Sequence, residues 1–179
     1  MSKTINFLHQ NLWIVIILIF FAACNKQSKP KLVFDIDTPG GEVMETYNDS
    51  TPRTVYYYKL DEKGVPTQEK IGEVHYFENK QEYTSGGYKD GKKDGKWYSF
   101  FRDGSLQSEI SYSDGKEHGA YLINREDGKP MIKGHYDHGN CDETWYWYDE
   151  NGKEIKKIKA DKNTIACDYC PKCLKLKQK

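Results

Sequence analysis

The sequence predicts an all-β fold: an extended antiparallel β-hairpin meander of 24-residue repeats, with an N-terminal signal helix and an irregular C-terminal tail. The same residue types recur 24 positions apart, as Gly91, Gly115 and Gly139 show. Fourteen tyrosines suit strands that are exposed on one face, and a hydrophobic fraction of 37% indicates a thin core. Such a chain stacks similar hairpins and does not close a pocket around one set of catalytic groups.

The repeat domain is expected at residues 51–158, with its best units at 88–111, 112–135 and 136–158. Each unit contains two turn signals, most of them Asp-Gly or Asn-Gly, whose residues tolerate positive φ. The structural turn glycines are Gly91, Gly104, Gly115, Gly128, Gly139 and Gly152. Each unit is therefore predicted to be a β-hairpin.

The strands between these turns alternate in polarity. Leu106, Ser108 and Ile110 point to one face and Gln107 and Glu109 to the other, which indicates one buried and one solvated face. The partner strands carry aromatic residues on both faces. We expect one face to form the core while the other displays rings as a contact surface, although the rings could instead merely cover the sheet. The candidate surface residues are Trp97, Tyr98, Phe100, Tyr121, Trp145, Tyr146, Trp147 and Tyr148.

An earlier, diverged copy of the unit precedes the three clear ones. Residues 72–77 match the aromatic strand of later units if one residue is deleted near 78–80. Before it, residues 56–58 followed by 61–64 indicate another aromatic strand and turn. Atypical end units are expected because a terminal repeat lacks a neighbour on one side.

The N-terminus predicts export. Residues 12–23 contain no polar side chain, and this run is shorter than the ~20 residues that a membrane-spanning helix needs, so residues 1–23 are read as a signal peptide. The segment 21–24 resembles the lipobox of bacterial lipoproteins, which implies cleavage after Ala23 and a lipid on Cys24. A plain signal peptide with an incidental cysteine is the alternative. Residues 24–50 are expected to be a tether with a short strand at 32–36.

The lipoprotein resemblance also implies a location. Asn25 is not the Asp that resembles an inner-membrane retention signal, and no acidic cluster follows it. We therefore expect the chain to be held in the outer membrane, facing the periplasm. Because one acyl chain binds a membrane only weakly, stable anchoring takes two or three of them on Cys24.

Four cysteines remain after Cys24, and their role is open. An even number in an exported chain favours disulfides among Cys141, Cys167, Cys170 and Cys173. The C-x-x-C-P-x-C spacing also fits a metal knuckle, with Cys141 as a fourth ligand. The thiols could also lack a role. The surrounding tail, 159–179, is rich in lysine and is expected to be a solvated end, with contact to anionic surfaces as the alternative.

No pattern predicts catalysis, a cofactor or nucleic-acid binding. His135, His138 and Cys141 are spaced as ligands could be, but His138 occupies the turn position of Asp90 and Asp114, so a turn explains it. The glycines are turn residues, and no phosphate-binding loop or Ser/His/Asp set is present. The formal net charge is zero, which gives no reason to expect a nucleic-acid partner.

The unit resembles the MORN-repeat variant family, seen in bacterial proteins labelled YwqK-family antitoxins. The match lies in residues 88–98 with 102–104, and in the corresponding 112–119; the third unit departs with Glu143 where Gly is expected. This resemblance implies an antiparallel β meander with a binding or scaffolding role. We therefore expect a lipid-anchored interaction module with a protein partner. The alternatives are an antitoxin-like or immunity protein, and a metal-binding or redox protein that uses the cysteine tail.

Overall fold

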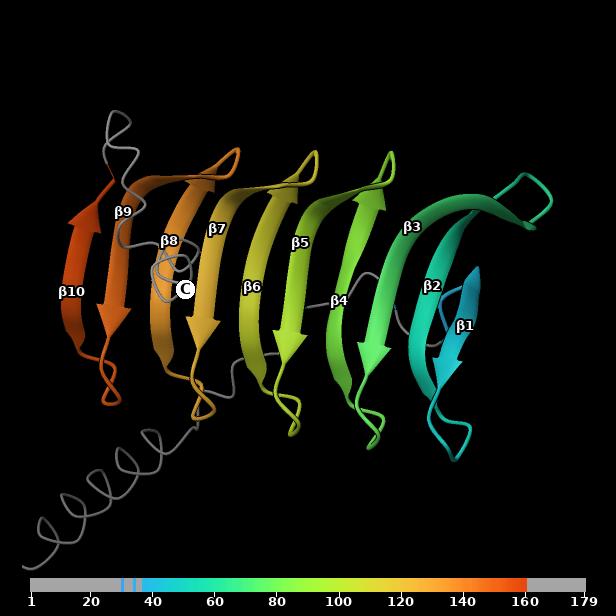
Figure 1. Ribbon diagram of the computed structural model, residues 1–179, viewed down its shortest axis with the longest axis horizontal. Helices are drawn as coiled ribbons and strands as arrows, with labels where there is room; N and C mark the ends of the chain where they lie inside the picture. The colour runs from blue at the N-terminus through green and yellow to red at the C-terminus, as the bar shows by residue number, and fades with distance from the viewer. Residues whose placement is uncertain (1–29, 31–33, 35–36, 161–179) are drawn as a thin grey trace, which may run out of the picture. The chain divides into compact units, whose positions relative to one another are not determined.

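The computed structural model describes residues 30, 34 and 37–160 of the chain. The chain divides into two units, Met1–Pro30 and Lys31–Lys179, and the fold described here belongs to the second. Ten strands form one antiparallel sheet in which each strand pairs with its sequence neighbours (Figure 1). They are β1 (Gly41–Thr46), β2 (Pro52–Leu60), β3 (Pro66–Tyr76), β4 (Glu82–Lys89), β5 (Lys92–Phe100), β6 (Leu106–Ser113), β7 (Lys116–Asn124), β8 (Pro130–Asp137), β9 (Asn140–Tyr148) and β10 (Glu154–Lys159). The expected all-β hairpin meander is confirmed.

The sheet begins earlier in the chain than expected. β1 lies inside the 24–50 segment that was predicted to be a tether, and it pairs with β2 from Gly41↔Tyr57 to Thr46↔Pro52. All six β1 residues are exposed, so a buried hydrophobic face does not mark this strand. The short strand expected at 32–36 falls largely outside the described residues.

Three two-residue turns join β4 to β5, β6 to β7 and β8 to β9, and all three lie at the same end of the strands (Figure 1). Both residues of each turn have positive φ, for example 51° at Asp114 and 80° at Gly115. This is the geometry of a type I′ turn, which matches the twist of a hairpin. Each later turn also contacts the preceding hairpin, since Gly115 N donates to Lys93 O and Gly139 N donates to Glu117 O.

Five-residue loops join all the other consecutive strands of the described sheet, and the fourth residue of each loop has positive φ. Gly104, Gly128 and Gly152 occupy this position in the clear units, whereas Lys80 occupies it in the diverged one. Loop 77–81 therefore has the same length as loop 101–105, and the deletion that we expected near 78–80 is wrong. The hairpin of β4 and β5 has a register shift between Ser85 and Gly87, and the hairpin of β6 and β7 has one between Ile110 and Tyr112.

Glu143 occupies a position that glycine fills in the two preceding units. Its φ of 53° lies in the same left-handed region as those of Gly95 (75°) and Gly119 (103°). The third unit thus keeps the backbone geometry of the others despite the substitution. A side chain in this region costs about 1–2 kcal/mol of backbone strain.

We expect Glu143→Gly to raise the free energy of unfolding by about 1 kcal/mol, because glycine removes that strain. Gly95→Ala is the matched reverse test, since a Cβ at Gly95 would meet nothing within 4 Å and only the φ of 75° opposes it. It should lower the free energy of unfolding by a similar amount. Urea unfolding followed by far-UV circular dichroism measures both. Equal stability of all three proteins would contradict the backbone assignment.

Six of the buried hydrophobic residues in the described part of the chain form two clusters. One joins Val55, Tyr57 and Val74 of β2 and β3 with Phe34, whose ring stacks on Tyr57 at 4.9 Å. The other is centred on Tyr136 and Trp145, with Tyr121, Ile132, Cys141, Trp147 and Ala160 packed against it. Aromatic rings thus supply much of the core, because the sheet has few aliphatic side chains to bury.

Glycines make room for the two most buried tryptophans. A Cβ atom at Gly86 would overlap the Trp97 indole, and a Cβ at Gly134 would overlap the Trp145 indole. The rings therefore lie flat against neighbouring backbone. Trp97 is 5% exposed and Trp145 is 2% exposed as a result.

Candidate interaction surface

A row of rings crosses the sheet on one of its two faces. The residue pairs Trp97↔Ile110 and Ile110↔Tyr121 fix a shared face across β5, β6 and β7. Ring contacts then connect Trp97 to Tyr88 at 5.4 Å and Tyr121 to Trp145 at 5.3 Å. We call this side the aromatic face. Its rings are Tyr56, Tyr88, Trp97, Tyr112, Tyr121, Tyr136, Trp145 and Trp147.

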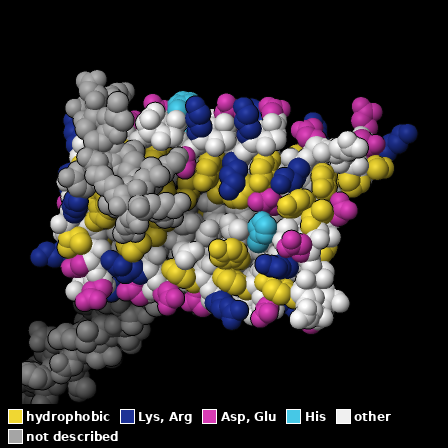
Figure 2. Space-filling model, viewed as in Figure 1, with side chains coloured by type: hydrophobic (Ala, Val, Ile, Leu, Met, Phe, Trp, Pro, Cys, Tyr) yellow, Lys and Arg dark blue, Asp and Glu magenta, His cyan; other side chains and the backbone are white. Residues whose placement is uncertain are grey.

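Lysine side chains lie over these rings. Lys70 Nζ is 4.1 Å from the ring centroids of both Tyr56 and Tyr88, and Lys93 Nζ is 3.6 Å from that of Trp97. An ammonium over a ring face gains a cation–π interaction. Burial lowers the pKa of the Lys93 ammonium, against the opposing charge of Glu73. Figure 2 shows hydrophobic side chains in a band across the strands, with Lys and Arg side chains among them.

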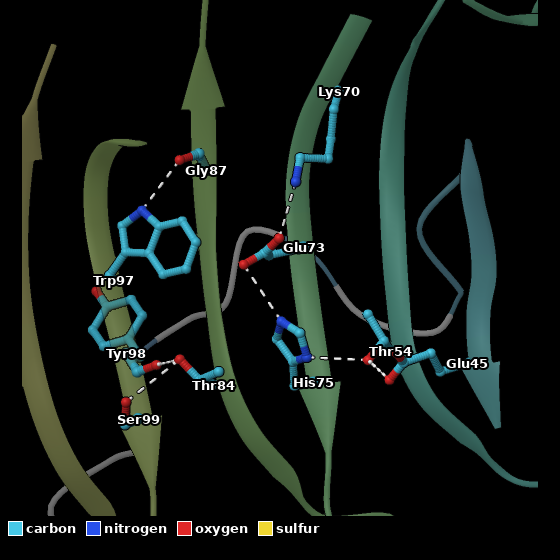
Figure 3. Close-up of polar contacts among 10 residues, drawn as sticks. All are labelled: Glu45, Thr54, Lys70, Glu73, His75, Thr84, Gly87, Trp97, Tyr98 and Ser99. Carbon is cyan, nitrogen blue, oxygen red and sulfur yellow. Dashed lines mark hydrogen bonds and ion pairs between the residues drawn. The ribbon is translucent and has the colours of Figure 1, made fainter. Parts of the chain in front are cut away.

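A buried carboxylate organises the polar part of this face in β2 and β3 (Figure 3). Glu73 Oε2 accepts a hydrogen bond from Lys70 Nζ at 3.0 Å, and Glu73 Oε1 lies 3.4 Å from His75 Nε2. His75 Nδ1 is 3.1 Å from Thr54 Oγ1, which in turn donates to Glu45 at 3.1 Å. Burial acts to raise the pKa of Glu73, but the hydrogen bonds from His75 and Lys70 outweigh it and hold that pKa at about 2.

The Glu73 carboxylate makes stability depend on pH. Its pKa falls from an ordinary 4.5 to about 2 on folding, so the unfolded chain takes up the proton more readily. The stabilisation is complete above pH 4.5 and is lost as the pH falls toward 2. We expect Glu73→Gln to be less stable than wild type at pH 7, and the difference to shrink as the pH drops through this window. Urea unfolding at pH 7, 4.5 and 3 measures it.

Glu69→Gln is the matched control, because Glu69 pairs with Lys59 on the surface at 3.0 Å with its side chain 49% exposed. An exposed ion pair of this kind contributes little to the free energy of unfolding. The free energy difference between this variant and wild type should stay near zero at every pH. A Glu73→Gln difference that does not change with pH would contradict the role assigned to Glu73.

The structure distributes the eight expected surface residues over both faces. Trp97, Tyr121, Trp145 and Trp147 lie on the aromatic face, whereas Tyr98, Phe100, Tyr146 and Tyr148 alternate with them on the opposite face. Half of these residues are buried: Trp97, Tyr98, Phe100 and Trp145 are each 8% exposed or less.

The expected separation of a core face from a ring-bearing face is therefore wrong for the repeats. On the aromatic face, the same rings form the core and line the surface, because indoles pack flat over Gly86 and Gly134. The rings left partly exposed on this face include Tyr112, Tyr121 and Trp147. These carry the candidate surface.

Lys70, Glu73 and His75 were not among the expected site residues. A strict 24-residue step places Glu73 in the row of Trp97, Tyr121 and Trp145. The assumed deletion near 78–80 aligned Val74 with Trp97 and hid this. Without it, a carboxylate in a row of rings would have signalled a buried, partnered charge.

The cysteine and histidine expectations have mixed outcomes. Cys141 on β9 lies opposite Tyr136 and is partly buried in the second hydrophobic cluster. Cys24, Cys167, Cys170 and Cys173 lie outside the described residues, so the lipid, disulfide and metal assignments for them stay predictions. His138 has the positive φ of a turn residue, as expected. The Nδ1 atom of His135 lies 4.0 Å from Oδ2 of Asp142.

The MORN repeat variant family model matches residues 93–114, which cover β5 from its second residue, the following loop and β6. This confirms the resemblance to MORN repeat variants, whereas the YwqK-family and lipoprotein resemblances stay predictions. No curated protein and no solved structure was found to match the chain. Within the described residues, no helix has the length and apolar character needed to cross a membrane.

Proposed function

We propose that this chain is a lipid-anchored scaffold whose aromatic face binds a protein partner. The observation that carries the proposal is the continuous row of rings with lysines lying over them, in which Tyr88 and Tyr112 are partly exposed and Trp97 between them is buried. Aromatic residues are enriched where protein surfaces meet, and a repeat sheet presents them over a large area. MORN repeats are generally interaction motifs, which supports the same role.

We infer further that the chain binds and does not catalyse. MORN repeats are typically non-catalytic. The most perturbed carboxylate on the described sheet, Glu73, is held by Lys70 and His75 in an arrangement that stabilises its charge. A general acid or base at neutral pH needs a pKa near the working pH, whereas this one is about 2.

Photo-crosslinking in intact cells tests the binding surface. A benzoyl-phenylalanine at Tyr112 or Trp147 samples the aromatic face, and one at Tyr83, which is 47% exposed on the opposite face, is the control. We expect one protein to be crosslinked from Tyr112 and Trp147 and not from Tyr83. Crosslinking of the same protein from all three positions, or of none, would contradict the proposal.

The anchor rests on Cys24, with cleavage after Ala23 and a place in the outer membrane facing the periplasm. We expect Cys24→Ala to move the protein from the membrane fraction to the soluble fraction, because the acyl chains supply the attachment. Ser28→Ala, four residues away in the chain, is the control and should stay in the membrane fraction. A Cys24→Ala protein that still sediments with membranes would rule out the lipid anchor.

A further inference from the structure

The turn between β8 and β9 brings two histidines together that are 20 positions apart in the chain. Gly139 N donates to Glu117 O at 2.7 Å, which seats this turn against the start of β7. The rings of His118, on β7, and His138, in the turn, then have centroids only 4.4 Å apart. Asp137 lies with them: its Oδ1 is 2.6 Å from His138 Nδ1 and 3.3 Å from His118 Nδ1.

The donor atoms of these three side chains converge. One ligand atom from each of His118, Asp137 and His138 lies within 4.8 Å of the other two. Zinc bonds to nitrogen and to carboxylate oxygen are about 2.0–2.2 Å long, so two ligands of one ion lie no more than about 4.4 Å apart. A small rotation of these side chains therefore brings the three donor atoms close enough to bind one ion. His118 Nδ1 is shielded from solvent and makes no hydrogen bond within the described residues, so it is available to a ligand.

The preceding unit secures the same turn in a different way. There Lys92 Nζ donates to Asp114 Oδ1 at 2.6 Å, which ties the β6–β7 turn to β5. His138 takes the place of Asp114 in the last turn, so the corresponding lysine–aspartate pair is not available. A positive ion held between His138 and the preceding hairpin would perform the same clamping.

We propose that His118, Asp137 and His138 bind a divalent metal ion of the Zn²⁺ class, which clamps the β8–β9 turn to β7. Two imidazoles and one carboxylate suit zinc, whereas Mg²⁺ and Ca²⁺ take oxygen ligands. Three protein ligands leave a fourth coordination position for a water molecule, and the exposed His138 lets solvent reach the ion. The site uses neither the rings of the aromatic face nor the cysteines of the tail.

The test is Zn²⁺ titration of the full chain by calorimetry in detergent. Cys141, Cys167, Cys170 and Cys173 are all replaced by serine, so that thiolates do not compete. We expect one Zn²⁺ to bind this parent protein. His118→Ala and His138→Asn should each abolish binding; asparagine is chosen because it tolerates the positive φ of 49° at His138. His135→Ala is the matched control, as it lies in β8 next to Asp142, and it should bind like the parent.

Thermal unfolding gives a second measurement and checks folding. Zn²⁺ should raise the midpoint of the parent and of His135→Ala, and leave those of His118→Ala and His138→Asn unchanged. Absence of Zn²⁺ binding to the folded parent would overturn the proposal. So would undiminished binding to His118→Ala and His138→Asn, or its loss in His135→Ala.

Discussion

Trp145→Ala should lower the free energy of unfolding by about 3–5 kcal/mol, the usual cost of removing a large buried ring. Trp145 is 2% exposed and has ring centroids at 5.0 Å from Tyr136 and 5.3 Å from Tyr121. Loss of the indole leaves a cavity that the rings of Tyr136 and Tyr121 cannot fill, because the sheet holds their strands in place. Far-UV circular dichroism during urea unfolding measures the change, since tryptophan fluorescence is altered by the substitution itself.

Two controls sharpen this prediction. Tyr83→Ala removes a ring that is 47% exposed, and it should cost much less. Trp145→Phe keeps a ring, and it deletes an indole N–H that has no hydrogen-bond partner within the described residues, so its cost should be small. By contrast Trp97→Phe should cost more, because Trp97 Nε1 donates to Gly87 O at 3.1 Å. Equal losses for Trp145→Ala and Tyr83→Ala would contradict the packing.

The effect of Trp145→Ala should also be local. Each strand of the sheet pairs only with its sequence neighbours, so the second hydrophobic cluster holds β7, β8 and β9 together while the first holds β2 and β3. Stability in such arrays is a sum over units and the interfaces between neighbours. Hydrogen exchange should therefore accelerate in β8 and β9 far more than in β2 and β3.

The repeat predicted the hairpins because local chemistry sets them. Asp-Gly and Asn-Gly turns demand positive φ, and Asp114, Gly115 and Gly128 all have it. Even His138, an uncommon turn residue, was placed correctly by the period alone. Strand alternation was also predictable, since Tyr98 and Phe100 do lie on the other face of the sheet from Trp97.

Burial was not predictable in the same way. Alternation tells which face a ring is on, but not whether a glycine on the next strand lets it lie flat, as Gly134 does for Trp145. The contact between His118 and His138 was missed for a related reason. It depends on a turn resting on the neighbouring hairpin, which the 24-residue step does not show, since these residues are 20 positions apart.

Glu73 shows what an end unit does differently. It occupies the row of Trp97, Tyr121 and Trp145, and on its other side it meets Tyr56 of β2. Lys70 lies over both Tyr56 and Tyr88 while it neutralises Glu73. The diverged unit thus replaces ring-on-ring packing by a paired charge between rings. A partner that binds the aromatic face would meet this charged end as well as the rings, which makes its orientation along the sheet specific.

Gly86→Ala should lower the free energy of unfolding by about 1–3 kcal/mol, the cost of overpacking a filled site. The added Cβ would overlap the Trp97 indole, which is buried under Lys93 and cannot move outward without losing that contact. Gly87→Ala is the adjacent control, because a Cβ there would meet its nearest atom, the carbonyl oxygen of Asp94, at an ordinary 3.4 Å. Its cost should be small.

A double-mutant cycle with Trp97→Ala identifies the cause. If the indole is what the new Cβ meets, Gly86→Ala should cost almost nothing in a protein that already lacks the Trp97 ring. The coupling free energy should then nearly equal the cost of Gly86→Ala alone. Additive losses, or equal costs for Gly86→Ala and Gly87→Ala, would mean that the ring does not lie over Gly86. The row that begins at Glu73 and continues through Trp97 would then lack the close contact with the sheet that the aromatic face requires.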